Sequence, residues 1–300
     1  MSEINQLEKD SLLYYQGGGS IIKLSPERQN LRAFYDVGNS YLVINALLMP
    51  GISNEKARLA EEGRRISLAV FECMEELLEV YCRLYSAMCK YTYYYEHDEM
   101  YHTYRDDRMN TLEFLNHGQM YSFMSTNRYN SGNTDFQDKD GILLLEVEAS
   151  GDVVHIDVNA VLQEISIYPH EQEILFAPFV VLDKEPLKIT EKEMLYKDIN
   201  GDPPKTKCLL HLRGSSIIPC EIDGHKEELK ELYAKIMDVK ALGTAKKIWK
   251  MLMNGGEPDC NAIQVYVKWK EKLQKYLRIS FAGIKYEIAH TIIDGRGNRG

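Results

Sequence analysis

Apolar side chains recur at steps of three and four residues through the first third of the chain. The positions are Ile66, Val70, Met74, Leu77, Tyr81, Leu84 and Met88. This spacing places them on one face of an α-helix, and Ser53, just after Pro50 and Gly51, is a suitable N-terminal cap. The pattern therefore predicts a long amphipathic helix that follows Ser53.

The pattern changes between about residues 100 and 220, where short apolar runs alternate with polar turns and predict β-strands. The expected strands are residues 101–105, 121–127, 142–147, 153–158, 174–181 and 208–212, with turns at 130–133 and 139–141. Helical spacing returns after residue 223, over 229–252, 258–277 and 284–293. The chain therefore reads as α+β, with an N-terminal helical region (1–98), a β-core (99–222) and a C-terminal helical region (223–300).

Two glutamates, Glu171 and Glu173, stand at the entry to the apolar run 174–181. Side chains alternate faces along an extended chain, so both carboxylates are expected to point the same way. Like charges this close repel, and a fold tolerates them more readily when a cation or a developing positive charge lies between them. Taken alone, the pair also fits an ordinary strand with a solvated acidic entry.

Two upstream segments give this pair a context. Arg105 ends the expected strand 101–105, Ser125 and Thr126 follow twenty residues later, and Glu173 lies forty-eight residues beyond Ser125. Arginine, Ser-Thr and Glu-x-Glu in this order and strand context resemble the R-S-E class of mono-ADP-ribosyltransferases. That class includes clostridial-type toxins, bacterial effectors and vertebrate arginine-specific transferases. The resemblance covers roughly residues 100–215, with Asp106 where the family often has Gly and Asn127 where it often has a second Ser.

The resemblance implies the ADP-ribosyltransferase fold, in which two small packed β-sheets enclose an NAD cleft, here flanked by N- and C-terminal helices. It implies transfer of ADP-ribose from NAD to a protein side chain, with arginine as the expected acceptor. NAD would be bound and consumed as a co-substrate, and no metal is implied. Two alternatives stay open: an NAD glycohydrolase, and a catalytically silent interaction module of the same fold. His102 and tyrosines 93–95 partly imitate the related H-Y-E class, which includes diphtheria toxin.

The resemblance assigns the catalytic roles to three residues. Glu173 would stabilise the oxocarbenium-like charge on the ribose as nicotinamide departs, a charge that exists only in the transition state. Ser125 would orient Glu173 through a hydrogen bond. Glu171 would hold an acceptor guanidinium and remove a proton from it, because a protonated guanidinium is a poor nucleophile.

The binding roles follow in the same way. Arg105 would bind the NAD phosphates or brace the ribose side, with Tyr104, Ser125, Thr126 and Arg128 on the cofactor side. Tyr168, in the segment before Glu171, could stack on the acceptor guanidinium. The alternatives are a surface ion pair for Arg105 with a nearby aspartate, and Arg108, Arg64 or Arg65 as the true anchor.

Composition and charge limit the classes of partner that the protein is expected to bind. The net charge of −9 argues against general nucleic-acid binding. From residue 223 on there are fifteen Lys/Arg against ten Asp/Glu, so that end is positive, which suits a partner protein on the C-terminal helical region or a solvated helical surface. No signal peptide or membrane span is visible, and the six cysteines show no CxxC spacing. The expected location is the cytoplasm, or export as an effector or toxin by a route with no cleavable signal.

Overall fold

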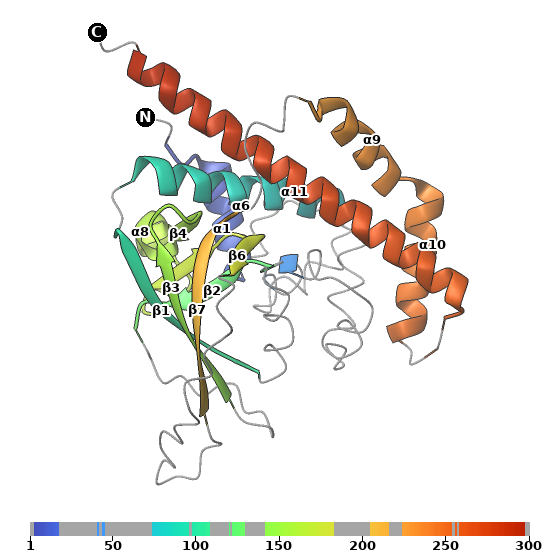
Figure 1. The fold of residues 1–300 in the computed structure, drawn as a ribbon, viewed down its shortest axis with the longest axis horizontal. Coiled ribbons are helices and arrows are strands. Elements are labelled where there is room, and N and C mark those ends of the chain that lie inside the picture. Colours follow the sequence, from blue (N-terminus) through green and yellow to red (C-terminus); the bar gives the residue numbers. More distant parts are fainter. Residues whose placement is uncertain are drawn as a thin grey trace. The chain divides into compact units, whose positions relative to one another are not determined.

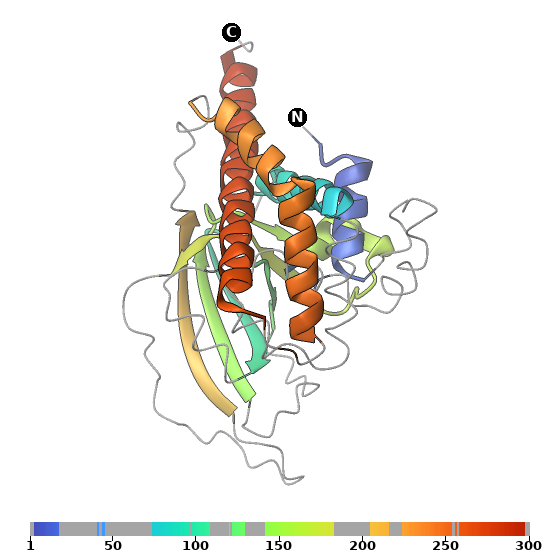
Figure 2. The ribbon, with the colours of Figure 1, turned by 90° about the vertical axis from the view of Figure 1, so that its right-hand side faces the viewer.

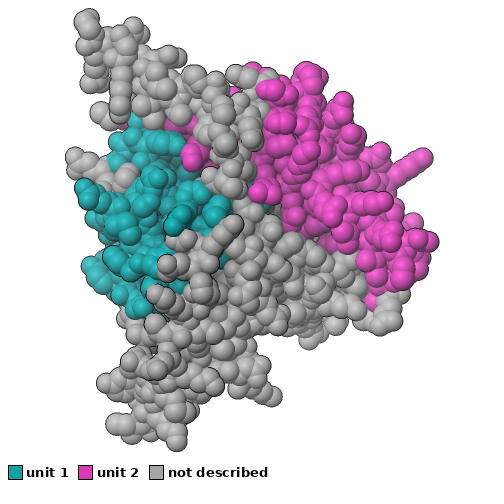
Figure 3. All heavy atoms as spheres, in the orientation of Figure 1, with its two compact units in different colours: residues 1–2, 88–216 teal, residues 3–87, 217–300 magenta. Residues whose placement is uncertain are grey.

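The computed structural model is shown in Figures 1 and 2. It groups into two compact units: residues 1–2 and 88–216 form one, and residues 3–87 and 217–300 form the other (Figure 3). The boundary between them therefore falls within one helix, at residues 87 and 88. The structure describes residues 3–17, 41, 44–45, 74–95, 98–108, 120, 122–129, 142–182, 205–215, 224–253, 256 and 258–297.

The expected N-terminal helix is described from residue 74 onward as α6, Met74–Tyr94. Its predicted apolar face is buried: Leu77, Leu84 and Met88 are at most 2% exposed. Ile66 and Val70 lie outside the described residues, as do the turns expected at 130–133 and 139–141. An additional helix, α1 (Gln6–Tyr15), precedes α6 and begins with a capping box formed by Asn5 and Glu8.

The helices after residue 223 differ in their limits from those predicted. The expected helix 229–252 is divided into α9 (Lys226–Ile236) and α10 (Val239–Met253). The division falls at Asp238, whose carboxylate accepts hydrogen bonds from the backbone N–H groups of Lys240 and Ala241 and so starts a new helix. Figure 2 shows α10 beside the long helix that follows it.

That long helix, α11 (Cys260–Gly297), is continuous, although the sequence predicted a break between residues 277 and 284. The reason is that its buried face continues across the expected break. Leu273, Leu277 and Phe281 are each at most 1% exposed. The Phe281 ring stacks on Tyr81 and Tyr85, with ring centroids 4.8 and 4.3 Å away.

Among the described residues, seven strands form one hydrogen-bonded sheet in the order β4-β5-β2-β1-β3-β7-β6. Neighbouring strands are antiparallel except β3 and β7, which are parallel. The helix α8 (Val158–Leu162) and the 3-10 turn η3 (Gln163–Ile165) follow β4 directly. The strands are β1 (Met100–Arg108), β2 (Met124–Asn127), β3 (Ile142–Ser150), β4 (His155–Asp157), β5 (Glu173–Phe176), β6 (Val180–Leu182) and β7 (Lys205–Ser215).

The expected strand 174–181 is therefore two strands. Between them stand Pro178, which cannot donate to a strand ladder, and Phe179, whose φ of 62° is left-handed. The two halves, β5 and β6, are separated by five inter-strand intervals in the sheet order. Across a flat sheet that is roughly 24 Å. The four Cα steps from Phe176 to Val180 span at most about 15 Å. The sheet must therefore curl.

Backbone hydrogen bonds hold the curled sheet near its closing point. Met120, which precedes β2, donates its N–H to the carbonyl of Val180 at 2.9 Å, and its own carbonyl accepts from the N–H of Phe179 at 2.6 Å. The family resemblance implied two small packed sheets. The described strands instead form one sheet, because β1 and β3 pair along nine residues and keep the two ends in one ladder.

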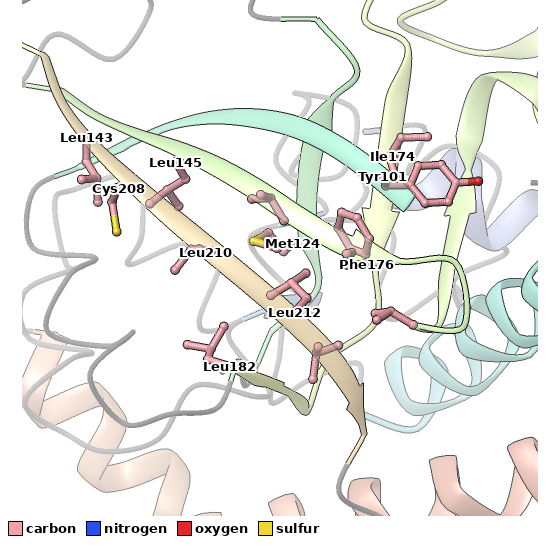
Figure 4. Close-up of a cluster of buried hydrophobic side chains, with 14 residues drawn as sticks. Tyr101, Met124, Leu143, Leu145, Ile174, Phe176, Leu182, Cys208, Leu210 and Leu212 are labelled. Carbon is pink, nitrogen blue, oxygen red and sulfur yellow. The ribbon is translucent and has the colours of Figure 1, made fainter. Parts of the chain in front are cut away.

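The hydrophobic core of this unit lies on one face of the curled sheet (Figure 4). It draws on strands from both ends of the sheet order, including Ile174 and Phe176 of β5 and Leu182 of β6. Tyr101, Met124, Leu145 and Leu210 add side chains from the strands between them. Curling thus encloses a core that a flat sheet of this size would leave exposed.

Phe176→Ala is expected to destabilise the protein by about 3–5 kcal/mol, because it leaves a cavity where the sheet curls. The measurement is the free energy of unfolding in urea, with Tyr129→Ala as control. Tyr129 is 67% exposed, and its loss is expected to change stability by less than about 0.5 kcal/mol. Similar losses from the two variants would contradict this placement of the core.

Candidate functional site

The structure brings Ser125 and Glu173 together. β2 and β5 pair antiparallel with Asn127 opposite Glu173 and Ser125 opposite Leu175, so Ser125 and Glu173 are diagonal neighbours on one face. The Ser125 Oγ donates a hydrogen bond to Glu173 Oε1 at 2.6 Å. Two residues that the sequence separates by forty-eight positions thus share one short bond.

The environment of this carboxylate makes the bond significant. Glu173 is 4% exposed, although it is the first residue of its strand. Burying a carboxylate costs free energy unless hydrogen bonds or charges compensate it. A hydroxyl-to-carboxylate bond of 2.6 Å has the length of a charge-assisted hydrogen bond, the stronger kind. Ser125 therefore both stabilises the buried Glu173 and fixes its orientation.

Thr126 points to the opposite face of β2, because side chains alternate along a strand. It is 2% exposed, and its Oγ1 donates to the carbonyl of Ile174 on β5 at 2.9 Å. The hydroxyl thus reinforces the β2–β5 pairing from the core side. Thr126 supports the strand that carries Ser125, and its predicted place on the cofactor side remains a prediction.

Arg105 contacts the backbone of Ser125. Its Nη1 donates to the Ser125 carbonyl at 2.9 Å, and its Nε pairs with Asp107 Oδ2 at 2.9 Å. Since Tyr104 lies opposite Asn127, strand alternation places Arg105 on the face of Thr126 and away from that of Ser125. Arg105 therefore positions the serine's main chain, and the ion pair considered for it from the sequence is present with Asp107.

Tyr104 shares the face of the Ser125–Glu173 pair. The register places Glu173, Asn127 and Tyr104 directly opposite one another on β5, β2 and β1. Tyr104 is half-buried. An aromatic ring, an amide and a carboxylate thus lie in one row across three strands, beside the Ser125 hydroxyl.

Arg128, just after β2, is held by two carboxylates. Its Nη1 donates to Asp98 Oδ2 at 2.7 Å and its Nη2 to Asp157 Oδ2 at 3.1 Å, and its guanidinium lies 5.5 Å from the Tyr101 ring centroid. The other Asp157 oxygen accepts from the Ala160 N–H and caps α8. Arg128 therefore links the end of β2 to the start of α8, and its predicted contact with NAD remains a prediction.

The two glutamates do not share one extended strand, and this corrects the sequence prediction. Gln172 between them has a φ of 47°, in the left-handed region, and β5 begins only at Glu173. Glu171 instead ends a turn in which its N–H donates to the Tyr168 carbonyl at 3.2 Å. Strand alternation therefore fails at Gln172, whose carbonyl accepts from the Arg128 N–H at 3.3 Å.

This turn gives Glu171 its own environment. Burial raises the pKa of the Glu171 carboxyl above its ordinary value, and the electrostatic effect of neighbouring His170 opposes the rise. Tyr168 in the same turn is half-buried. Glu171 is thus a partly desolvated carboxylate, and Glu173 is fully buried and bound by a hydroxyl.

Three residues near the site were not identified from the sequence: Asp98, Asp157 and Asn159. Asp157 carried a detectable signal, because aspartate before an apolar run is a common helix N-cap. Asn159 carried none. Its Nδ2 donates to the carbonyls of Tyr168 and Pro169, at 3.4 and 2.9 Å, and its Oδ1 accepts from the Ser166 hydroxyl at 3.1 Å.

No protein-family model matches the chain, and no curated protein sequence matches it. Within the described part of the chain, no group of three or more His, Cys, Asp or Glu residues is arranged to hold a metal ion. No helix among the residues that the structure describes is long and apolar enough to cross a membrane.

Ser125 and Glu173 are expected to be energetically coupled through their hydrogen bond. Ser125→Ala should cost about 1–3 kcal/mol, because Glu173 loses a donor that offsets its burial. In the double variant with Glu173→Gln the two costs should not add, and a coupling of about 0.5–3 kcal/mol is expected from denaturant unfolding of the four proteins. Ser122→Ala with Glu173→Gln is the control pair, and additive costs for Ser125 would contradict the bond.

Proposed function

We propose that the protein is an NAD-dependent mono-ADP-ribosyltransferase that transfers ADP-ribose from NAD to an arginine side chain of a protein and releases nicotinamide. The observation that carries the proposal is the 2.6 Å bond from the Ser125 hydroxyl to the buried carboxylate of Glu173. The R-S-E resemblance requires this pair to meet, and the β2–β5 register makes the two residues diagonal neighbours on one face.

The same residues have the chemistry that the first step needs. As the bond between the ribose C1′ and the nicotinamide nitrogen breaks, nicotinamide takes the bonding electrons and positive charge develops on the ribose. A carboxylate fixed in advance stabilises this charge without reorganising. Ser125 holds Glu173 in one orientation, and Arg105 holds the backbone of Ser125 through the 2.9 Å bond to its carbonyl.

Glu171 suits the acceptor step. A guanidinium nitrogen forms the new bond to C1′ and must lose a proton, which the Glu171 carboxylate would accept. Burial raises the pKa of Glu171, and a raised pKa makes a carboxylate a better base. The turn that separates Glu171 from Glu173 supports different tasks for the two carboxylates, because only Glu173 is bound to Ser125.

Glu173→Gln is expected to lower NAD turnover by about 10²–10³, because the amide cannot supply the negative charge that the transition state needs. The assay is release of nicotinamide from NAD, and mass spectrometry of a protein mixture incubated with labelled NAD identifies the modified side chain. Circular dichroism must show the variant folded. Near-normal release by the folded variant would remove Glu173 from this role, and release by the wild type without any protein modification would favour the glycohydrolase.

Glu171→Gln is expected to preserve most NAD hydrolysis and greatly reduce transfer to arginine. The ribose charge forms whatever the acceptor, whereas only a guanidinium must be held and deprotonated. The comparison is nicotinamide release against modification of an arginine-containing protein, in wild type and variant. Equal losses in both assays would make Glu171 part of the NAD site.

The pH dependence of stability tests the raised pKa of Glu171 without an activity assay. The pKa of Glu171 is raised in the folded state, so the wild type loses stability relative to Glu171→Gln as pH rises through that pKa. The glutamine variant should therefore be the more stable protein at pH 7. The difference should vanish below the ordinary glutamate pKa, where both side chains are neutral. Urea unfolding of both proteins at pH 3.5 and 7 measures this difference in the free energy of unfolding.

A further inference from the structure

Asn159 makes three side-chain hydrogen bonds to the segment that leads to Glu171. Its Nδ2 donates to two successive carbonyls, those of Tyr168 and Pro169, and its Oδ1 accepts from the Ser166 hydroxyl. Donors and acceptor of one amide are thus all engaged with a stretch of four residues, 166–169. The segment 166–171 is named the acceptor segment below.

The acceptor segment lies between η3 and β5. It belongs to no helix or strand, and Ile167, Pro169 and His170 are exposed. Two local backbone bonds shape it, from Ser166 N–H to the Gln163 carbonyl and from Glu171 N–H to the Tyr168 carbonyl. Asn159 is seven to ten positions earlier in the chain, so it ties the segment to a separate element, the helix α8.

The helix α8 is itself fixed to the strand that carries Ser125. Asp157 caps α8 with one carboxylate oxygen and pairs with Arg128 through the other, at 3.1 Å. Arg128 directly follows the last residues of β2, and its N–H donates to the Gln172 carbonyl. A continuous series of bonds therefore runs from β2 through Arg128 and Asp157 to α8, and through Asn159 to the acceptor segment.

We propose that Asn159 is a positioning residue that fixes the acceptor segment, and with it Glu171, relative to the Ser125–Glu173 pair. Asn159 bonds to residues 166, 168 and 169, so it would act on the acceptor step through the Tyr168–Glu171 turn. The ribose step depends on Glu173, which Ser125 holds independently. The effect of Asn159 on the acceptor step rests on the proposed function, whereas its anchoring of the acceptor segment does not.

The test is Asn159→Ala, with Asn159→Asp as a second variant and Glu164→Ala as the control. The aspartate can still accept from Ser166 but cannot donate to the two carbonyls, so it should fail as the alanine does. Glu164 is exposed, near the acceptor segment in sequence. Hydrogen exchange of the peptide covering residues 166–172 should be roughly two- to tenfold faster in both Asn159 variants and unchanged in the control. A peptide from β3 should exchange as in the wild type.

Activity supplies the second readout. Both Asn159 variants should lose transfer to an arginine-containing protein at least about fivefold relative to NAD hydrolysis, through a higher KM for the acceptor. Unchanged exchange of residues 166–172, or equal losses of transfer and hydrolysis, would overturn the positioning role. A wild-type protein that leaves NAD intact would instead overturn the proposed function, and the exchange experiment would still decide whether Asn159 anchors the segment.

Discussion

Residues 177–179 impose the constraint on which the rest of the strand-bearing unit depends. They join β5 and β6, which stand five intervals apart in the sheet, with a chain too short to cross a flat sheet of that width. The sheet can satisfy this link only by curling, and the curl places side chains from both ends of the sheet into one core. The hydrogen bonds of Met120 to Phe179 and Val180 fix the closing point. Glu173 is the first residue of β5, so the short link between β5 and β6 also constrains where Glu173 lies.

β2 shows how fold and site share consecutive residues without competing. Ser125 and Thr126 point to opposite faces because strand side chains alternate. The Thr126 hydroxyl bonds the Ile174 carbonyl on the core side, and the Ser125 hydroxyl bonds Glu173 on the other. Both interactions pull β2 against β5. A buried carboxylate is thereby held by a strand whose own position is secured from the opposite face, which is how a fold fixes a charged group precisely.

What the sequence predicted follows from local patterns. Apolar spacing predicted the buried face of α6 and most strand positions, whereas the meeting of Ser125 with Glu173 was expected only from the R-S-E resemblance. The left-handed Gln172 and Phe179 were not predicted, because neither residue type favours that conformation, and both bond to residues from elsewhere in the chain, Arg128 and Met120. The continuity of α11 was missed for a similar reason, since Phe281 gains its partners from α6. Gln172, Phe179 and the continuous part of α11 thus all have partners from distant parts of the chain, which local sequence patterns do not reveal.

The left-handed residue between the two glutamates is the feature that most changes the chemical picture. On one extended strand, Glu171 and Glu173 would have faced the same way and shared one environment, and their charges would have opposed each other. With the turn at Gln172, the two carboxylates have different environments. Glu173 is deeply buried and accepts a hydrogen bond from the Ser125 hydroxyl, whereas Glu171 is partly buried next to His170. Pairs of titratable groups whose environments differ can take different roles in one reaction. A backbone conformation that costs free energy locally thus separates Glu173, the carboxylate proposed to stabilise the ribose charge, from Glu171, the one proposed to hold the acceptor.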